Sequence, residues 1–173
     1  MSTLHVENLK GPTSGANANK ITVPTGQTLS AAGHVVQVVH NTTSTQATIT
    51  SASHVDTGLS ASITPTSTSN KILITVTIQL RLQANASSDS GAGWKLLRGS
   101  TALRTTPNNY NNYVYGGTAN GEFRGTESFS FLDSPATTSS TTYKVQGARY
   151  GSSLFKVQDN NTFSEIVLME IAQ

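Results

Sequence analysis

The clearest pattern in this chain is a strict alternation of apolar and polar residues from Lys71 to Leu82. Every even position of KILITVTIQLRL is apolar, and the odd positions are polar except Leu73. Because successive side chains of a β-strand point to opposite faces, the alternation predicts a strand with one buried face. Most of its apolar residues are β-branched, which favours a pleated strand over a helix.

Weaker alternation predicts further short strands along the chain. They span residues 35–39, 45–50, 59–63, 94–98, 128–132, 142–150 and 163–171. Segments rich in Gly, Pro, Asn and Ser separate them, and no stretch of useful length has helical periodicity. Seven or eight short strands at this spacing predict an antiparallel sandwich, Greek key or jelly roll.

The last of these segments interrupts the alternation with an apolar run from Ile166 to Met169. A strand that is covered on both faces accounts for such a run. The cover is either the second sheet of a sandwich or another subunit.

Residues 1–33 differ from the rest, because a polar run rich in Gly, Ala and Asn separates two short apolar pieces. The apolar residues are Leu4, Val6 and Leu9 in the first piece, and Ile21 and Val23 in the second. They are too few to form a core, so the segment is predicted to be an arm that docks onto another body, most simply copies of the same chain. A flexible N-terminus or an extra edge strand fits the pattern equally well. The predicted organisation is an arm over residues 1–33 and one β domain over residues 34–173.

Composition narrows the possible functions. The 173 residues include 22 serines, 26 threonines and 13 asparagines, but no cysteine, so disulfides and thiolate chemistry are absent. The net charge is +2 and the basic residues are spread singly, which argues against a nucleic-acid partner. The N-terminus lacks the pattern of a secretory signal and no apolar run reaches membrane-spanning length, so we expect a soluble protein that is made in a cytoplasm and does not insert into a membrane.

Candidate catalytic or metal-binding sets are weak. The histidines His5, His34, His40 and His54 have no ligand spacing. Glu122 and Glu127 lie five residues apart, and Asp133 precedes a Ser-Pro turn that accounts for it. We therefore predict no catalytic residue, no metal and no cofactor. An ion that copies of His5 or His34 hold on a three-fold axis stays open as an alternative.

The most distinctive segment is PNNYNNYVYGG, residues 107–117, because tyrosine and asparagine are the chemistry of adaptable binding loops and carbohydrate sites. Its candidate receptor-binding residues are Asn108, Asn109, Tyr110, Asn111, Asn112, Tyr113 and Tyr115. The alternative is that the tyrosines pack back onto the sandwich. Arg104 and Arg124 flank the segment as possible donors.

Three other aromatic residues, Trp94, Phe129 and Phe131, are predicted to lie in the core. Tyr150 and the Gly-Ser-Ser that follows it are a second candidate for an exposed loop.

Taken in order, several phrases resemble the small fibre and virion structural proteins of tailed bacteriophages, particularly those of marine bacteria and cyanobacteria. The phrases are STLHVENLKG, KITVPTGQTLSAAG, HVVQVVHNTTST, SITPTSTSNKILITVTI, WKLLRGSTALR, FSFLDSPATTSSTTYKVQ and EIVLMEIAQ, and they cover nearly the whole chain. The resemblance implies an N-terminal part that attaches to the virion and a C-terminal β-sandwich head, assembled as a homotrimer. The chain lacks the extended repeats, coiled-coil heptads and chaperone tail of long fibres, so a short fibre is expected.

The resulting expectation is an all-β, jelly-roll-like antiparallel sandwich with an N-terminal docking arm. It forms a short trimeric tail fibre or spike on the virion, whose partners are its own copies, other tail or baseplate proteins, and a glycan or protein of the host cell surface. A capsid decoration or baseplate component without a receptor role is one alternative. A carbohydrate-binding module of non-viral origin is the other.

Overall fold

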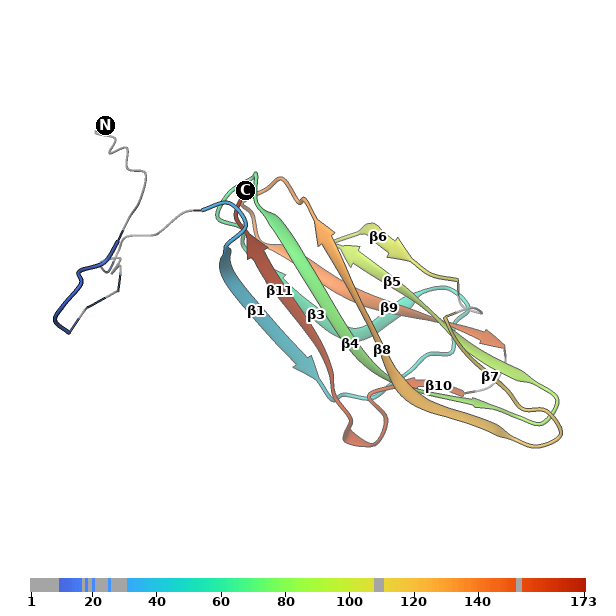
Figure 1. Ribbon diagram of the computed structural model, residues 1–173. Helices are drawn as coiled ribbons and strands as arrows, with labels where there is room; N and C mark the ends of the chain where they lie inside the picture. The colour runs from blue at the N-terminus through green and yellow to red at the C-terminus, as the bar shows by residue number, and fades with distance from the viewer. Residues whose placement is uncertain are drawn as a thin grey trace. The chain divides into compact units, whose positions relative to one another are not determined.

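The computed structural model describes residues 10–16, 18, 20, 25, 31–107, 111–151 and 154–173. The chain divides into two compact units, Met1–Ala31 and Ala32–Gln173. In the first unit, the Ala18 N–H donates to the Gly15 carbonyl at 3.1 Å. The second unit is built almost entirely of β-strands and carries the features that follow (Figure 1).

The strands and the one short helix of the described chain follow in order. They are β1 (Val35–Thr43), β2 (Ala47–Thr48), β3 (Val55–Ile63), β4 (Lys71–Ala84), β5 (Asp89–Arg98), β6 (Thr101–Thr105), β7 (Asn112–Tyr115), β8 (Gly121–Asp133), β9 (Thr141–Gly151), β10 (Leu154–Val157), the 3-10 helix η1 (Asp159–Asn161) and β11 (Ser164–Ile171).

These strands form two antiparallel sheets that pack against each other (Figure 1). In sheet A, β8 pairs with one side of β4. On its other side, the first half of β4 pairs with β11, and β11 pairs with β1. The second half of β4 pairs with β10, and β10 pairs with β2. In sheet B the order is β3-β9-β5, and β6 and β7 pair with successive parts of the outer edge of β5. The predicted all-β sandwich is therefore confirmed.

The core lies between the sheets and is centred on β4, whose side chains alternate between buried and half-buried along the whole strand. Ile74 and Ile78 have no exposed surface, and Trp94 of sheet B is 2% exposed. The Trp94 ring meets the Phe155 ring edge-on, with centroids 5.5 Å apart. Trp94 is thus a core residue, as predicted, while Phe129 and Phe131 are half-buried against the core.

Two segments that the sequence analysis assigned to loops are strands. Residues 89–93 form the first half of β5, and residues 112–115 form β7, which pairs with them. Small residues fill this part of β5 and asparagines surround β7, so neither segment has the apolar alternation that reveals a strand. The run from Ile166 to Met169 does alternate in the structure: Ile166 and Leu168 are buried, whereas Val167 and Met169 lie half-buried on the outer face of sheet A.

The two ends of the sandwich differ. At the entry end, Gly33 N donates to the Ala172 carbonyl at 2.8 Å, so the chain enters this unit beside its own C-terminus. The β4–β5 and β7–β8 connections lie at the opposite end (Figure 1), and each reverses the chain like a hairpin although its two strands belong to different sheets. Gly116 N donates to the Ser88 carbonyl at 2.8 Å, which joins the two connections. We call this the hairpin end.

Candidate functional site

The predicted receptor-binding segment runs along the edge of β5 at the hairpin end. Asn108, Asn109 and Tyr110 lie outside the described residues. The part that follows is strand β7, so its side chains alternate across the sheet. Val114 packs inward against the core. Tyr113 and Tyr115 point outward and are 47% and 64% exposed.

The asparagines of this segment have partners within the protein. Asn111 Nδ2 donates to Glu127 Oε1 at 2.7 Å, and Asn112 Nδ2 donates to Glu127 Oε2 at 3.2 Å. Trp94 Nε1 donates to Asn112 Oδ1 at 2.9 Å. These bonds tie β7 to β8 and to the core tryptophan. Both amides therefore help to hold the sandwich together at this edge.

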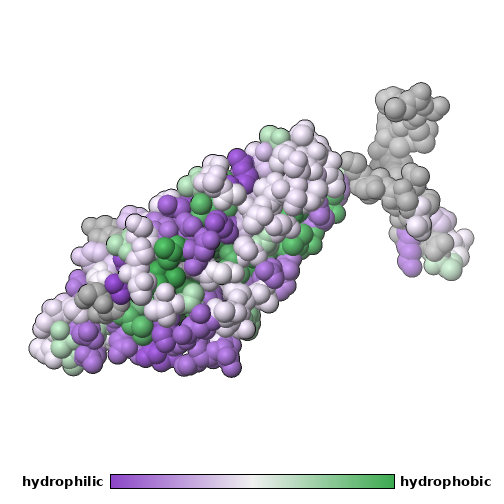
Figure 2. All heavy atoms as spheres, turned by 180° about the vertical axis from the view of Figure 1, so that it is seen from behind, coloured by the Kyte–Doolittle hydropathy of each residue, from purple (hydrophilic) through white to green (hydrophobic). Residues whose placement is uncertain are grey.

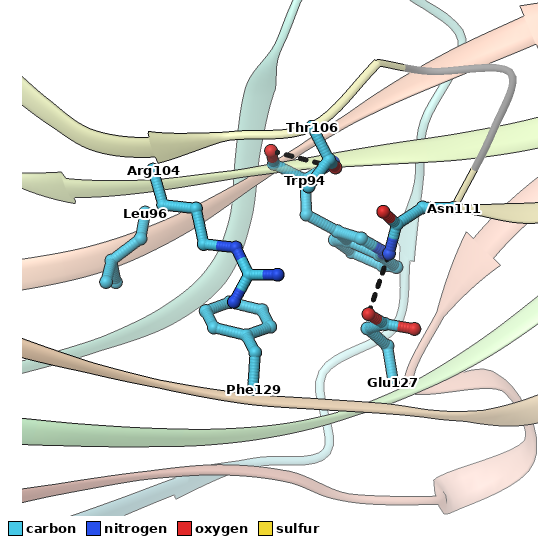
Figure 3. A pocket seen from close by; sticks show the side chains of 7 residues that line it. All are labelled: Trp94, Leu96, Arg104, Thr106, Asn111, Glu127 and Phe129. Atoms are coloured by element: carbon cyan, nitrogen blue, oxygen red, sulfur yellow. Dashed lines mark hydrogen bonds between the residues drawn. The ribbon is translucent and has the colours of Figure 1, made fainter.

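Beside this network, a depression lies between the edge of β8 and the edge of sheet B (Figure 3). The Arg104 guanidinium lies over the Phe129 ring, 5.2 Å from its centroid. Figure 3 shows Arg104 and Phe129 on one side of the depression, and Trp94 and Glu127 on the other. The space between these side chains is too narrow for a water molecule. Arg104 therefore contributes a cation–π contact across the sandwich edge rather than a wall of an open site.

The outward tyrosines form a cluster on the face of sheet B. Tyr113 of β7 and Tyr150 of β9 both lie opposite Gly91 of β5 in register. Because Gly91 has no side chain, nothing on β5 separates the two tyrosine rings. Their centroids are 6.4 Å apart and their planes are inclined by 37°. Tyr115 lies opposite Asp89, the next outward residue of β5. We call Tyr113, Tyr115 and Tyr150 the tyrosine cluster.

A hydrogen bond fixes the Tyr113 ring. Its hydroxyl donates to Asp89 Oδ2 at 2.5 Å. This bond, with smaller contributions from desolvation and from the negative charge of Asp89, raises the pKa of Tyr113 to about 12. At neutral pH the hydroxyl is therefore protonated and its ring is held in place. Fixed, partly exposed tyrosine rings offer broad contact area at low entropic cost, which suits stacking against a sugar ring or a peptide side chain.

The candidate carboxylates are separated by the sheet. Glu127 pairs in register with buried Ile78, whereas Glu122 pairs with Gln83 on the outer face. Glu122 also accepts hydrogen bonds from Arg124 and Arg81, which lower its pKa. Two carboxyl groups on opposite faces of one strand cannot act on the same bond, so they do not form an acid–base pair.

Asp133 also has a structural role. Arg98 Nη1 donates to both of its oxygens at 2.9 Å, and Tyr143 donates to Oδ2 at 2.7 Å. Burial, and then this bond to Asp133, raise the pKa of Tyr143. The three residues link β8 to the two central strands of sheet B through the buried carboxylate of Asp133.

The three histidines that the structure describes do not converge. His40 Nε2 lies 3.3 Å from Glu165 Oε2 on the outer face of sheet A. Burial and the nearby Lys95 lower the pKa of His54, and the His34 carbonyl accepts a hydrogen bond from Ala172 N, just after β11. Within the described ranges, no three His, Cys, Asp or Glu residues are grouped so as to hold a metal ion. His5 lies outside those ranges.

The predicted arm residues Leu4, Val6, Leu9, Ile21 and Val23 also lie outside the described residues. The docking arm therefore stays a prediction. Among the helices that the structure describes, none is long and apolar enough to cross a membrane.

Sequence reasoning missed an open groove of about 350 Å³ at the hairpin end. Its walls come from the β2 region, the end of β4, the end of β9 and the start of β10. Since four separate segments contribute one or two residues each, no local motif marks the groove. Only the pairing of β10 with both β2 and β4 brings them together.

Comparison with known proteins does not assign the chain to a family. No family model and no curated protein matches the chain. Among solved structures, the dimeric latent PorU from Porphyromonas gingivalis is similar over 90% of this chain, at 10% identity and a TM-score of 0.34. The chain spans 15% of the length of that protein. A likeness this weak carries no argument about fold or function.

Proposed function

We propose that this chain is a bacteriophage virion protein, a short trimeric tail fibre or spike. It attaches through residues 1–33 and presents the sandwich for adhesion to a glycan or protein of the host surface. The observation that carries the adhesion role is the tyrosine cluster, which lies on an exposed face towards the hairpin end, away from the entry end. The sequence resemblance to phage fibre proteins supplies the biological setting.

The arrangement of the strands supports the jelly-roll-like form of this proposal. The four main strands of sheet A follow the order β1-β11-β4-β8, and those of sheet B follow the order β3-β9-β5-β6. Neighbours in each sheet are mostly distant in sequence, as expected where consecutive strands alternate between two sheets. β3 and β4, for example, are consecutive in sequence and belong to different sheets.

Self-association is supported by an apolar stripe on the outer face of sheet A. In register across four strands lie Val38, Met169, Leu73 and Leu132. Val38 is 56% exposed and Leu132 is 51% exposed. On the opposite side of the body, near-neutral and hydrophilic residues surround apolar patches that are separate from one another (Figure 2). A continuous exposed stripe of this kind is typical of an interaction surface.

A second copy of the chain is the occupant that suits this stripe. A neighbouring row of the same face contains Thr75 and Ser130, whose hydroxyls are cheaper to desolvate than charges. In a homotrimer the stripes of three copies converge on the axis, so apolar residues meet apolar residues. The same contact covers Val167 and Met169, the outward residues of the apolar run in the last strand.

The proposal assigns no chemical step to the protein. Glu122 and Asp133 are both engaged by arginines, and Glu127 accepts from two asparagines. A capsid decoration or baseplate component shares every feature except the adhesion role, so the adhesion experiment separates the two.

That experiment compares binding of the purified protein to a panel of marine bacterial and cyanobacterial strains. The variant Tyr113→Ala/Tyr115→Ala is expected to lose at least about tenfold in adsorption, because exposed tyrosines dominate such contacts. Its thermal stability should stay close to that of the unmodified protein. The matched control is Phe163→Ala, since Phe163 is 61% exposed and lies outside the cluster. Equal adsorption of all three proteins, or adsorption of none to any strain, contradicts the adhesion role.

A further inference from the structure

The groove at the hairpin end has the size and shape of a ligand site. Its free volume of about 350 Å³ falls within the range of roughly 300–1,000 Å³ for small-molecule pockets. Half-buried Leu154 gives it an apolar wall. The neighbouring Phe155 is fully buried and packs edge-on against Trp94 in the core, so it anchors the strand that carries Leu154.

The polar lining combines groups that both donate and accept hydrogen bonds. Gln83 and Asn85 bring side-chain amides, and Thr48 and Thr50 bring hydroxyls. Sugar hydroxyl groups also donate and accept, so each of them can be matched here. A phosphate or sulfate group at neutral pH mainly accepts, and it leaves the amide oxygens without partners. The lining therefore suits a saccharide better than a simple oxyanion.

The charge of the lining is positive. Arg149, half-buried at the end of β9, is the one charged residue among the residues that line the groove, and none of them is acidic. A guanidinium can bind a carboxylate with two parallel hydrogen bonds. Arg149 is therefore suited to a carboxylate that is attached to a polar, hydroxylated ring.

The surroundings extend this positive character. Lys156 lies opposite Thr48 in register and opposite Arg81 on its other side, and Arg124 follows in the same row. These three cations share the two carboxylates of Asp159 and Glu122 through ion pairs. One positive charge remains in excess beside the groove, which favours an anionic ligand over a neutral one.

We propose that the groove binds a carboxylate-bearing sugar, such as a uronic acid unit of an acidic polysaccharide. The carboxylate contacts Arg149, the ring lies against Leu154, and the hydroxyls contact the amides and threonines. The inference rests on the proposed adhesion role and deepens it by naming a ligand class. The groove is nevertheless a separate site from the tyrosine cluster, so the two can be tested apart.

The direct test titrates the isolated, isotope-labelled protein with an oligogalacturonide and follows backbone amide shifts by NMR. The control ligand is the same oligosaccharide with its carboxyl groups reduced to alcohols. We expect saturable shifts at groove residues such as Thr48, Gln83 and Asn85 with the acidic oligosaccharide, and at least about tenfold weaker binding of the reduced one. Acetate and inorganic phosphate should not displace the sugar at equal concentration. Equal binding of both oligosaccharides, equal competition by the small anions, or no shifts in the groove overturns the inference.

Two variants locate the contact. Arg149→Gln should weaken binding of the acidic oligosaccharide by about tenfold or more. Gln83→Glu keeps the size of the side chain but adds a negative charge to the groove, so it should weaken binding of the acidic oligosaccharide and not of the reduced one. This variant tests the inference even if Arg149→Gln fails to fold. Tyr113→Ala/Tyr115→Ala should leave oligogalacturonide binding unchanged. If the groove variants bind normally while the tyrosine variant loses cell adsorption, the groove inference is wrong and the proposed function survives.

Discussion

Glu170 is a buried carboxylate that joins three segments at the entry end. Its Oε1 accepts from Thr66 N and Asn70 Nδ2, both at 2.7 Å, and from Thr66 Oγ1 at 2.8 Å. Its Oε2 accepts from Gln37 Nε2 at 2.5 Å. Burial acts to raise the pKa of Glu170, but these hydrogen bonds outweigh it and lower the pKa to about 2. The carboxylate therefore fastens the β3–β4 connection to β1 and β11.

This low pKa predicts how acid affects stability. The pKa is about 2 in the folded state against 4.5 ordinarily, so ionised Glu170 stabilises the fold above pH 4.5 and loses this effect as the pH falls towards 2. The shift corresponds to about 3 kcal/mol. Glu170→Gln should therefore lower the free energy of unfolding by about 1–3 kcal/mol at pH 7, and the difference should shrink on acidification. Denaturant unfolding at pH 7, 4.5 and 2.5 measures it.

Glu165→Gln is the matched control, because Glu165 is on the same strand but half-exposed beside His40. It should change stability by less than about 1 kcal/mol at each pH. A Glu170 variant whose deficit stays constant from pH 7 to pH 2.5 contradicts the role of the ionised carboxylate.

At the scale of elements, the sequence predicted the strands that have an alternating pattern of their own. From Lys71 to Leu82 the sequence of β4 alternates at every position except Leu73, so the strand and its buried face could be inferred without knowledge of its partners. β7 has four residues, and its stability depends on β5, whose glycines carry no pattern of their own. The tyrosines of β7 were recognised by composition, but the contact of Tyr113 with Tyr150 across Gly91 depends on strand register. The groove depends on register in the same way and was therefore missed.

The alternation of β4 makes a matched pair of neighbouring substitutions informative. Ile74→Ala should destabilise the protein by about 2–5 kcal/mol, since Ile74 has no exposed surface and lies in register between Leu168 and Phe131. Thr75→Ala, one residue further on the outer face, should cost below about 1 kcal/mol. Chemical denaturation followed by the fluorescence of the single tryptophan, Trp94, measures both. Equal losses at the two positions contradict the assignment of the buried face.

At the scale of the whole sandwich, the proposed function divides its surfaces between two roles. The apolar stripe crosses sheet A near the entry end, where Gly33 bonds to Ala172. The tyrosine cluster and the groove lie towards the hairpin end. A contact between copies at the stripe leaves both candidate binding sites accessible. Three heads on one axis can then bind a surface together, so weak binding by each head becomes strong binding by the assembly.

The division of roles predicts a variant that separates assembly from ligand binding. Leu132→Glu places a charge in the stripe at a side chain that is already 51% exposed, so it should convert a trimer to a monomer with little change in the fold of each copy. Light scattering coupled to size exclusion measures the mass. Binding of each head to soluble ligand should persist, while adsorption to cells should fall by at least about tenfold through lost multivalency.

Thr126→Glu is the control, because Thr126 is exposed on the same face of β8 but away from the stripe. If Leu132→Glu still has the mass of a trimer, the stripe is not the interface between copies. If the unmodified protein has the mass of a monomer, the proposed trimer is wrong.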